Sequence, residues 1–197
     1  MKIYFARHGE YQNPDRISPY RLPGFPLTEL GQTQSRNIAG HLSDQKIRAL
    51  YTSPIERCLE TATIIGSQLH LFPNQKPELI ETGTPLAGIN LDDPRHALPT
   101  YLYNLPEHIE GGGETPEQIF TRFNDFIEKL KLTSINSNYL LVSHADPIMI
   151  YLHGAHKLSL PRTDQEIIGG GIRYIPMGGL VMLDYNQKGI PAYSEII

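Results

Sequence analysis

The sequence predicts an α/β fold, a three-layer α/β/α sandwich with a mostly parallel central sheet and a lid insertion. Three apolar runs carry this prediction, at residues 2–7, 47–52 and 139–143. Each run is short and bounded by turn or polar residues, which is typical of strands buried on both faces of a parallel sheet. Segments with helical spacing of apolar residues lie between the runs, as the crossovers of a parallel sheet require.

Length and composition fit one domain, residues 1–197. A domain of this size buries about 70% of the surface of its unfolded chain, enough for a substantial core. The net charge of -4 gives no reason to expect nucleic acid or an anionic membrane as a partner. The single cysteine cannot form an internal disulfide, and no apolar run reaches the about 20 residues of a membrane span. The first predicted strand leaves no room for a signal peptide, so we expect a cytoplasmic protein.

The helices are predicted from their capping residues. Thr28 can cap the first helix. Ser53-Pro54-Ile55-Glu56 has the pattern of a capping box and is expected to start a helix that runs to about residue 70. Thr115-Pro116-Glu117-Gln118 is a second capping box. Pro147 is expected at the first position of the helix after the third apolar run.

Residues 72–114 hold many Pro and Gly and few periodic apolar positions. This segment is too long for a plain loop. We therefore expect residues 82–113 to form a lid, with a short helix at about 96–103 and a hinge at Gly111-Gly112-Gly113-Glu114. Elsewhere, the pattern predicts a polar loop at 159–171 and strands at 77–81, 172–175, 180–185 and 192–196.

Two of the predicted strands run directly into histidine. The first ends in Arg7 and is followed by His8 and Gly9, and the third is followed by His144. Ligands of open α/β sheets bind at the carboxyl ends of the strands. A guanidinium and two imidazoles are therefore expected at a binding crevice, where Gly9 would let the backbone turn sharply or approach a ligand closely.

Arg57 lies in the first turn of the helix that follows the second strand, where free N–H groups and the helix dipole favour anions. If the three strands are neighbours, Arg7, His8, Arg57 and His144 converge. Guanidiniums match phosphate oxygens, so this set describes a phosphate pocket. The guanidiniums would keep His8 neutral, and a neutral imidazole can attack phosphorus to form a phosphohistidine.

Four motifs follow one another along almost the whole chain. They are Arg7-His8-Gly9-Glu10, Leu27-Thr28-Glu29-Leu30-Gly31 with Gln34, Ser53-Pro54-Ile55-Glu56-Arg57 with Thr61-Ala62, and Val142-Ser143-His144. In this order they resemble the histidine phosphatase superfamily, the phosphoglycerate-mutase-like group. The resemblance implies a metal-independent phosphatase without a cofactor, whose partner is a small phosphomonoester substrate.

The same resemblance implies roles for individual residues. Arg7 and Arg57 would bind the phosphate, and His144 would donate to one of its oxygens. Glu81 would be the general acid, because Leu79-Ile80-Glu81 looks like the segment that carries the family's acid. Asp146 is the alternative acid; its other expected role is to cap the helix at Pro147.

Other functions stay open at this point. Family mutases generally carry a longer insertion, so the compact chain favours hydrolysis over a phosphoglycerate-type mutase. A phosphate-binding protein with little turnover is a further alternative, and a homodimer is possible. The side chains proposed to line the lid are those of Arg95, His96, Tyr101 and Tyr103.

A histidine pair and the single cysteine are not expected to form functional sites. His153 and His156 have no obvious third ligand, so no metal site is expected there. Cys58 lacks the arginine that follows the thiol of a cysteine phosphatase, so it is predicted to be a core residue.

Overall fold

Six strands form one sheet in the order β3-β2-β4-β1-β5-β6. β1 to β4 are parallel, whereas β5 and β6 form an antiparallel edge beside β1. The structure is a computed structural model that describes residues 1–94, 103, 105–133, 136–185 and 190–197. The strands are β1 (Lys2–Arg7), β2 (Ile47–Thr52), β3 (Pro73–Gln75), β4 (Asn138–Ser143), β5 (Leu180–Asp184) and β6 (Ala192–Glu195).

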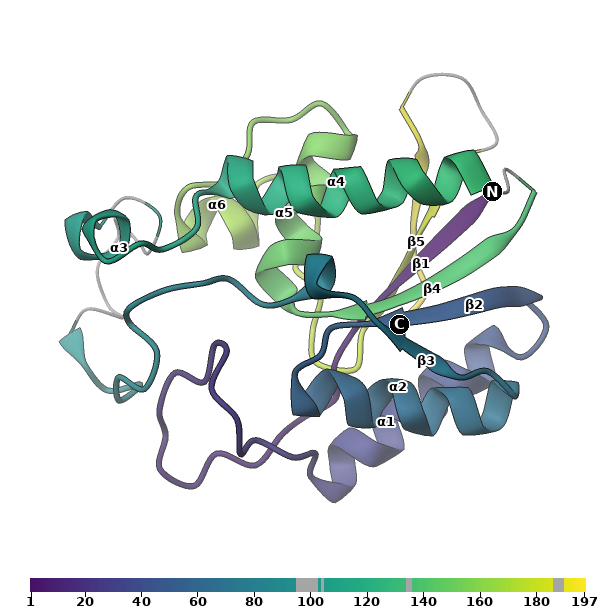
Figure 1. The fold of residues 1–197 in the computed structure, drawn as a ribbon, viewed down its shortest axis with the longest axis horizontal. Coiled ribbons are helices and arrows are strands. Elements are labelled where there is room, and N and C mark those ends of the chain that lie inside the picture. Colours follow the sequence, from purple (N-terminus) through teal and green to yellow (C-terminus); the bar gives the residue numbers. More distant parts are fainter. Residues whose placement is uncertain (95–102, 104, 134–135, 186–189) are drawn as a thin grey trace.

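Helices cover both faces of the sheet, which confirms the predicted α/β/α sandwich. α1 and α2 lie on one face, and α4 and α5 lie on the other with α6 beside them (Figure 1). α3 lies apart from the sheet, beyond the carboxyl ends of the parallel strands (Figure 1). The helices are α1 (Glu29–Leu42), α2 (Glu56–Leu69), α3 (Pro106–Glu110), α4 (Pro116–Thr133), α5 (Ala145–Ala155), α6 (Asp164–Gly169) and the 3-10 turn η1 (Pro77–Leu79).

Strand alternation divides the interior into two cores. In β1, Ile3 and Phe5 face the core under α4 and α5, whereas Tyr4 and Ala6 face the core under α1 and α2. Successive side chains of a strand point to opposite faces, so a strand covered on both sides must be apolar at every position. This is why the run could be recognised in the sequence.

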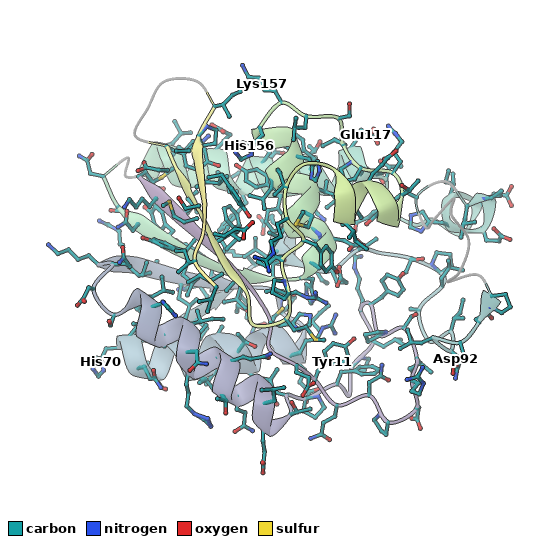
Figure 2. All side chains as sticks on the ribbon, turned by 180° about the vertical axis from the view of Figure 1, so that it is seen from behind. Tyr11, His70, Asp92, Glu117, His156 and Lys157 are labelled. Atoms are coloured by element: carbon teal, nitrogen blue, oxygen red, sulfur yellow. The ribbon has the colours of Figure 1, made fainter. Side chains whose placement is uncertain are left out.

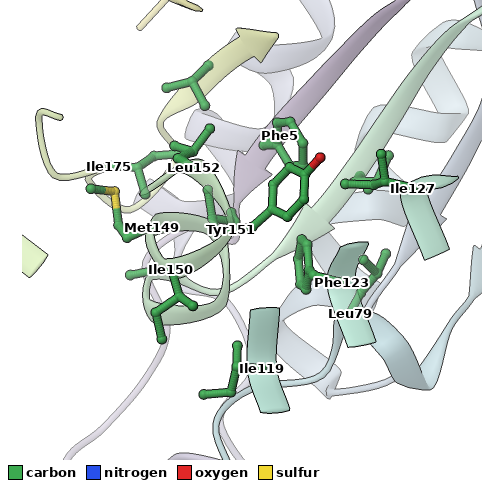
Figure 3. Packing of buried hydrophobic residues seen from close by; sticks show 14 of the residues in the cluster. Phe5, Leu79, Ile119, Phe123, Ile127, Met149, Ile150, Tyr151, Leu152 and Ile175 are labelled. Atoms are coloured by element: carbon green, nitrogen blue, oxygen red, sulfur yellow. The ribbon is translucent and has the colours of Figure 1, made fainter. Parts of the chain in front are cut away.

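Aromatic packing fills the larger core. The Tyr151 ring of α5 lies between β1 and α4, with its centroid 5.5 Å from that of Phe5 and 5.7 Å from that of Phe123 (Figure 3). The hydroxyl groups of Tyr151 and Tyr185 lie 2.5 Å apart, so the one polar atom of the buried ring is paired. This contact ties α5 to the antiparallel edge of the sheet.

Two predicted helix starts are confirmed and two are wrong. Thr28 Oγ1 accepts from the N–H of Gly31, and Thr115 forms a reciprocal capping box with Gln118. At α2, by contrast, Ile55 is the N-cap and no side chain caps the helix. The Ser53 hydroxyl accepts from the N–H of Ile55, before the helix begins, and also contacts His144 Nε2 across the strand ends. Local capping rules could not reveal this long-range contact.

The start of α5 differs from its prediction because the helix begins earlier than Pro147. His144 is its N-cap and Ala145 its first residue, so Asp146 lies in the first turn and does not cap the helix. The N-cap needs only an extended backbone, which His144 has. Asp146 is thereby left free for another role.

Three other predictions of secondary structure are also wrong. Residues 77–81 form η1 and an irregular extension rather than a strand, and 164–169 form α6 within the predicted loop. Residues 172–175 are irregular although Ile172 and Ile175 are buried. Their apolar pattern reflects packing against the core, not strand pairing, and an apolar run alone does not distinguish the two.

Residues 82–94 leave the carboxyl edge of the sheet, and the chain returns through α3 to α4 (Figure 1). The predicted helix at 96–103 lies outside the described residues, apart from Tyr103. No helix among the described residues is long and apolar enough to cross a membrane.

The aromatic core gives a stability prediction. Phe123→Ala removes a fully buried ring beside Tyr151, so the free energy of unfolding should fall by about 3–5 kcal/mol in urea denaturation. Leu132→Ala is the control in the same helix. Its side chain is 89% exposed, so the expected change is within about 0.5 kcal/mol. Equal effects of the two substitutions would contradict the packing described here.

Candidate active site

The two histidines are brought together by strand order. β4 lies beside β1 with Ser143 in register with Arg7, so His144 and His8 follow adjacent strand ends. Their ring centroids are 5.2 Å apart. Gly9 is needed for close backbone approach, because a Cβ there would lie 2.4 Å from the carbonyl oxygen of Gly31. The turn after β1 can therefore pack against α1 only with glycine at this position.

Arg57 joins the two imidazoles. Its guanidinium is 1% exposed, with Nε 3.2 Å from His8 Nε2 and Nη2 3.1 Å from His144 Nδ1. Nη2 also donates to the carbonyl oxygen of Tyr20 at 2.8 Å. Arginine has only donors, so both histidine nitrogens must accept.

These contacts fix the ring tautomers. His8 Nδ1 lies 2.9 Å from its acceptor, the carbonyl oxygen of Gly9, and therefore carries the proton, which leaves a lone pair on Nε2. His144 Nδ1 accepts from Arg57, so its Nε2 donates to Ser53 Oγ at 2.9 Å. The assignment follows from the hydrogen-bond partners rather than from observed hydrogens.

Burial keeps both imidazoles neutral. Loss of solvent lowers the pKa of His8 and of His144 well below the ordinary value, and the charges of Arg57 and Arg7 lower it further. A protonated ring in this place would face two guanidiniums without water. His8 therefore keeps its Nε2 lone pair at neutral pH.

The pocket itself has a volume of about 210 Å³. Arg7 and Arg57 both line it, and each retains a buried N–H group, Nε and Nη1 respectively, without a hydrogen-bond partner among the described residues. Arg7 is held in place through Nη1, which donates to the carbonyl oxygen of Ile175 at 3.1 Å. Unpaired guanidinium donors suit the oxygens of a bound anion.

Two carboxyl groups line the same pocket. Glu81 Oε2 lies 3.3 Å from His144 Nδ1 and 3.6 Å from Arg57 Nη2. Burial, followed by the charge of Asp146, raises the pKa of Glu81 to about 7, against the opposing effect of Arg57. Burial also raises the pKa of Asp146, which accepts from the hydroxyl of Tyr103 at 3.1 Å. A carboxyl with a pKa near neutrality can both give and take a proton.

The structure thus brings together all five residues predicted for the site. Some lining residues were not predicted from the sequence. Tyr11 contacts His8 with a centroid distance of 5.4 Å and lies beneath Arg57, whereas Tyr174 comes from the irregular segment after α6 and lies beneath Arg7. Proximity to His8 in sequence was a usable signal for Tyr11, but no local pattern marks Tyr174.

The residues proposed to line the lid are described only in part. Arg95, His96 and Tyr101 lie outside the described residues. Tyr103 is buried and donates to Asp146, a residue that lines the pocket.

Cys58 and the remaining histidine pair have no place in the pocket lining. Cys58 is buried, as predicted, with Sγ 3.4 Å from His144 Nε2, and burial raises the pKa of its thiol. His153 and His156 bond to backbone carbonyls of their own helix. Figure 2 places His156 well away from Tyr11, which borders the pocket.

Residues 3–172 match the family model of the histidine phosphatase superfamily (branch 1). The chain belongs to this superfamily. The match covers the strand-end histidines and both arginines of the pocket, and it confirms the resemblance seen in the sequence motifs.

Three known proteins illustrate what this chain is similar to. Fructose-2,6-bisphosphatase TIGAR B of Danio rerio is 27% identical over 91% of this chain and 68% of its own. A 2,3-bisphosphoglycerate-dependent phosphoglycerate mutase of Thermoplasma acidophilum is 27% identical over 95% of this chain and 98% of its own. The solved mycobacterial glucosyl-3-phosphoglycerate phosphatase in complex with VO3 has a TM-score of 0.80, with 17% identity, over 100% of this chain and 97% of its own.

These similarities indicate phosphatase or mutase activity. They also weaken the argument that a compact chain favours hydrolysis. Since this chain spans 98% of a phosphoglycerate mutase, compactness alone does not separate the two activities. The choice between them must rest on the pocket.

The neutral imidazoles predict a pH effect on stability. Below about pH 6.5 the unfolded state takes up a proton at His8 that the folded state refuses, so the free energy of unfolding falls as pH decreases. In His8→Asn this contribution disappears, and the pH slope should be smaller by up to about 1.4 kcal/mol per pH unit. Urea denaturation from about pH 7.5 to about pH 5.5 measures it.

His41→Asn is the matched control, because His41 lies exposed on α1. It should leave the slope of the wild type unchanged. If His8→Asn also kept that slope, His8 would not be held neutral by burial.

Proposed function

We propose that this protein hydrolyses a small phosphomonoester through a phosphohistidine on His8. The observation that carries the proposal is the lone pair of His8 Nε2, fixed by the Nδ1 contact with Gly9 and placed in a pocket lined by two guanidiniums. This combination supplies a nucleophile together with stabilisation of the charge on a transferring phosphoryl group.

The first half of the reaction forms the phosphoenzyme. Arg57 exchanges its contact with His8 Nε2 for a phosphoryl oxygen, which frees the ring lone pair. Arg7 and Arg57 then bind the phosphoryl oxygens while His8 Nε2 attacks phosphorus, and the bond from phosphorus to the leaving oxygen breaks. Glu81 gives its proton to that oxygen, so the alcohol leaves neutral. The pKa of Glu81, about 7, suits this transfer at neutral pH.

The second half regenerates the enzyme. Water attacks phosphorus, Glu81 takes a proton from it, and the phosphorus–nitrogen bond breaks so that His8 recovers its lone pair. We propose that His144 assists by donating from Nδ1 to a phosphate oxygen once the bound phosphoryl group has replaced the Arg57 contact seen in this structure. The ring stays neutral in that tautomer, because the Ser53 hydroxyl can then donate to Nε2.

The lining of the pocket favours hydrolysis over phosphoryl transfer between two hydroxyls. Among the described residues that line it, only Arg7 and Arg57 are cationic. A mutase must hold a doubly phosphorylated intermediate, which needs positive charge at both ends of the ligand. The other described lining residues include two carboxyl groups, Glu81 and Asp146, and uncharged side chains such as Tyr174 and Leu91. An uncharged alcohol or sugar leaving group fits this surface best.

A phosphomonoester panel tests the activity. The wild type should release inorganic phosphate without added bisphosphoglycerate. A chelator should not prevent this release, because the guanidiniums neutralise the phosphoryl charge. His8→Ala should lower kcat at least about a thousandfold, whereas His41→Ala should not change it. Labelled phosphate should remain on the wild-type protein, but not on His8→Ala, after rapid alkaline quenching.

Other results of this assay would indicate one of the alternative functions. Turnover that depends on bisphosphoglycerate would indicate a mutase, and phosphate binding without turnover would indicate a binding protein. Full activity of His8→Ala would exclude the phosphohistidine mechanism.

The pH profile tests the acid. The protonated form of Glu81 donates, so kcat/KM should fall as pH rises through about 7. In Glu81→Gln this alkaline limb of the profile should disappear. The rate for a substrate with a poor leaving group should also fall about 10²–10⁴-fold. Asp146→Asn is the comparison: if it abolished the limb while Glu81→Gln retained it, Asp146 would be the acid.

A further inference from the structure

Glu114, the last residue of the Gly-Gly-Gly-Glu motif, binds two arginines that do not line the pocket. Its Oε1 accepts from Arg122 Nε at 2.9 Å, and its Oε2 accepts from Arg122 Nη2 at 3.2 Å. Oε2 also accepts from Arg21 Nη2 at 2.5 Å and from the N–H of Gly83 at 2.9 Å. One carboxylate therefore joins α4, the loop before α1 and the segment that follows η1.

Both arginines also reach the backbone of the proposed acid. Arg21 Nε donates to the carbonyl oxygen of Glu81 at 2.7 Å, and Arg122 Nη2 lies 3.4 Å from the same oxygen. Arg122 Nη1 donates to the carbonyl oxygen of Glu78 at 2.6 Å. The N–H of Glu114 completes the set by donating to the carbonyl oxygen of Gly83 at 2.9 Å.

We propose that Arg21, Glu114 and Arg122 form a clamp that positions Glu81 for proton transfer to the leaving group. The three residues are positioning residues, because they hold the backbone of the acid and do not line the pocket. The proposal rests on the function proposed above.

The need for a clamp follows from where Glu81 lies. It belongs to no helix or strand, so no regular hydrogen-bond ladder fixes its backbone. A general acid must lie within hydrogen-bond reach of its acceptor, and a displacement of about 1 Å can cost about 10²-fold in rate. Regular elements position functional groups better than loops do. Here the bidentate contact with Arg122 transfers the rigidity of α4 to an irregular segment.

The clamp also joins the two ends of the excursion that was predicted to form a lid. Residues 78–83 lead into it and Glu114 ends it, so the same carboxylate holds both of its ends together. The two ends of the excursion and the acid are thereby positioned by one set of contacts. Glu114 and Arg122 are partly shielded from solvent, with 21% and 16% of their side chains exposed.

Glu114→Gln tests the clamp with two substrates. An alkyl phosphate needs a proton on its leaving oxygen, whereas an aryl phosphate with a weakly basic leaving group scarcely does. The variant should lower kcat for the alkyl phosphate by about 10–100-fold and for the aryl phosphate by less than about threefold. Glu117→Gln, three residues along and half exposed, is the control and should change neither.

A second comparison separates positioning from general damage. If Glu114 acts through Glu81, adding Glu114→Gln to Glu81→Gln should cause no further loss with the alkyl phosphate. Equal losses on both substrates, or a full additional loss in the double variant, would overturn the clamp. Arg122→Lys keeps the charge but loses the bidentate contact, and it provides the same test should Glu114→Gln not fold.

The two proposals fail in different ways. If Glu81→Gln lowers kcat equally for the alkyl and the aryl phosphate, Glu81 is not the general acid, and the clamp proposal is wrong as well. If Glu81→Gln discriminates and neither Glu114→Gln nor Arg122→Lys does, only the clamp is wrong.

Discussion

The site depends on one buried cation, the Arg57 guanidinium. Removing such a charge from water is costly unless its N–H groups find acceptors. Arg57 finds them in His8 Nε2, His144 Nδ1 and the carbonyl oxygen of Tyr20. Because those nitrogens must accept, both rings must be neutral there. One contact set therefore stabilises the arginine, orients both rings and keeps the ring proposed to attack phosphorus neutral.

Burial has opposite effects on the two kinds of titratable group in the pocket. It lowers the pKa of His8 and His144 and raises that of Glu81 and Asp146, since the neutral form is favoured in every case. A neutral base and a protonated acid can therefore coexist near pH 7. The arginines add to the first effect and oppose the second, which leaves the pKa of Glu81 at about 7.

Local rules succeeded where the physical cause was local. Thr28 and Thr115 cap the helices they precede, because an N-cap contact spans only a few residues. They failed where a distant group competed. Ser53 has the same local pattern, but its hydroxyl pairs with His144, and Pro147 marks a helix that starts earlier because His144 provides the N-cap. Both failures occur at the site, where chain segments far apart in sequence meet.

The sequence alone determined the sandwich, the family resemblance and the strand-end positions of Arg7, His8 and His144, because buried parallel strands are apolar throughout and their polar ends stand out. Only the tertiary structure decided what Arg57 contacts and which ring nitrogens carry protons. It placed β4 between β1 and β2, so the three motif ends became neighbours. It also set the surroundings of Glu81. Hydrogen-bond partners and burial depend on which strands are adjacent, and no single stretch of sequence specifies that.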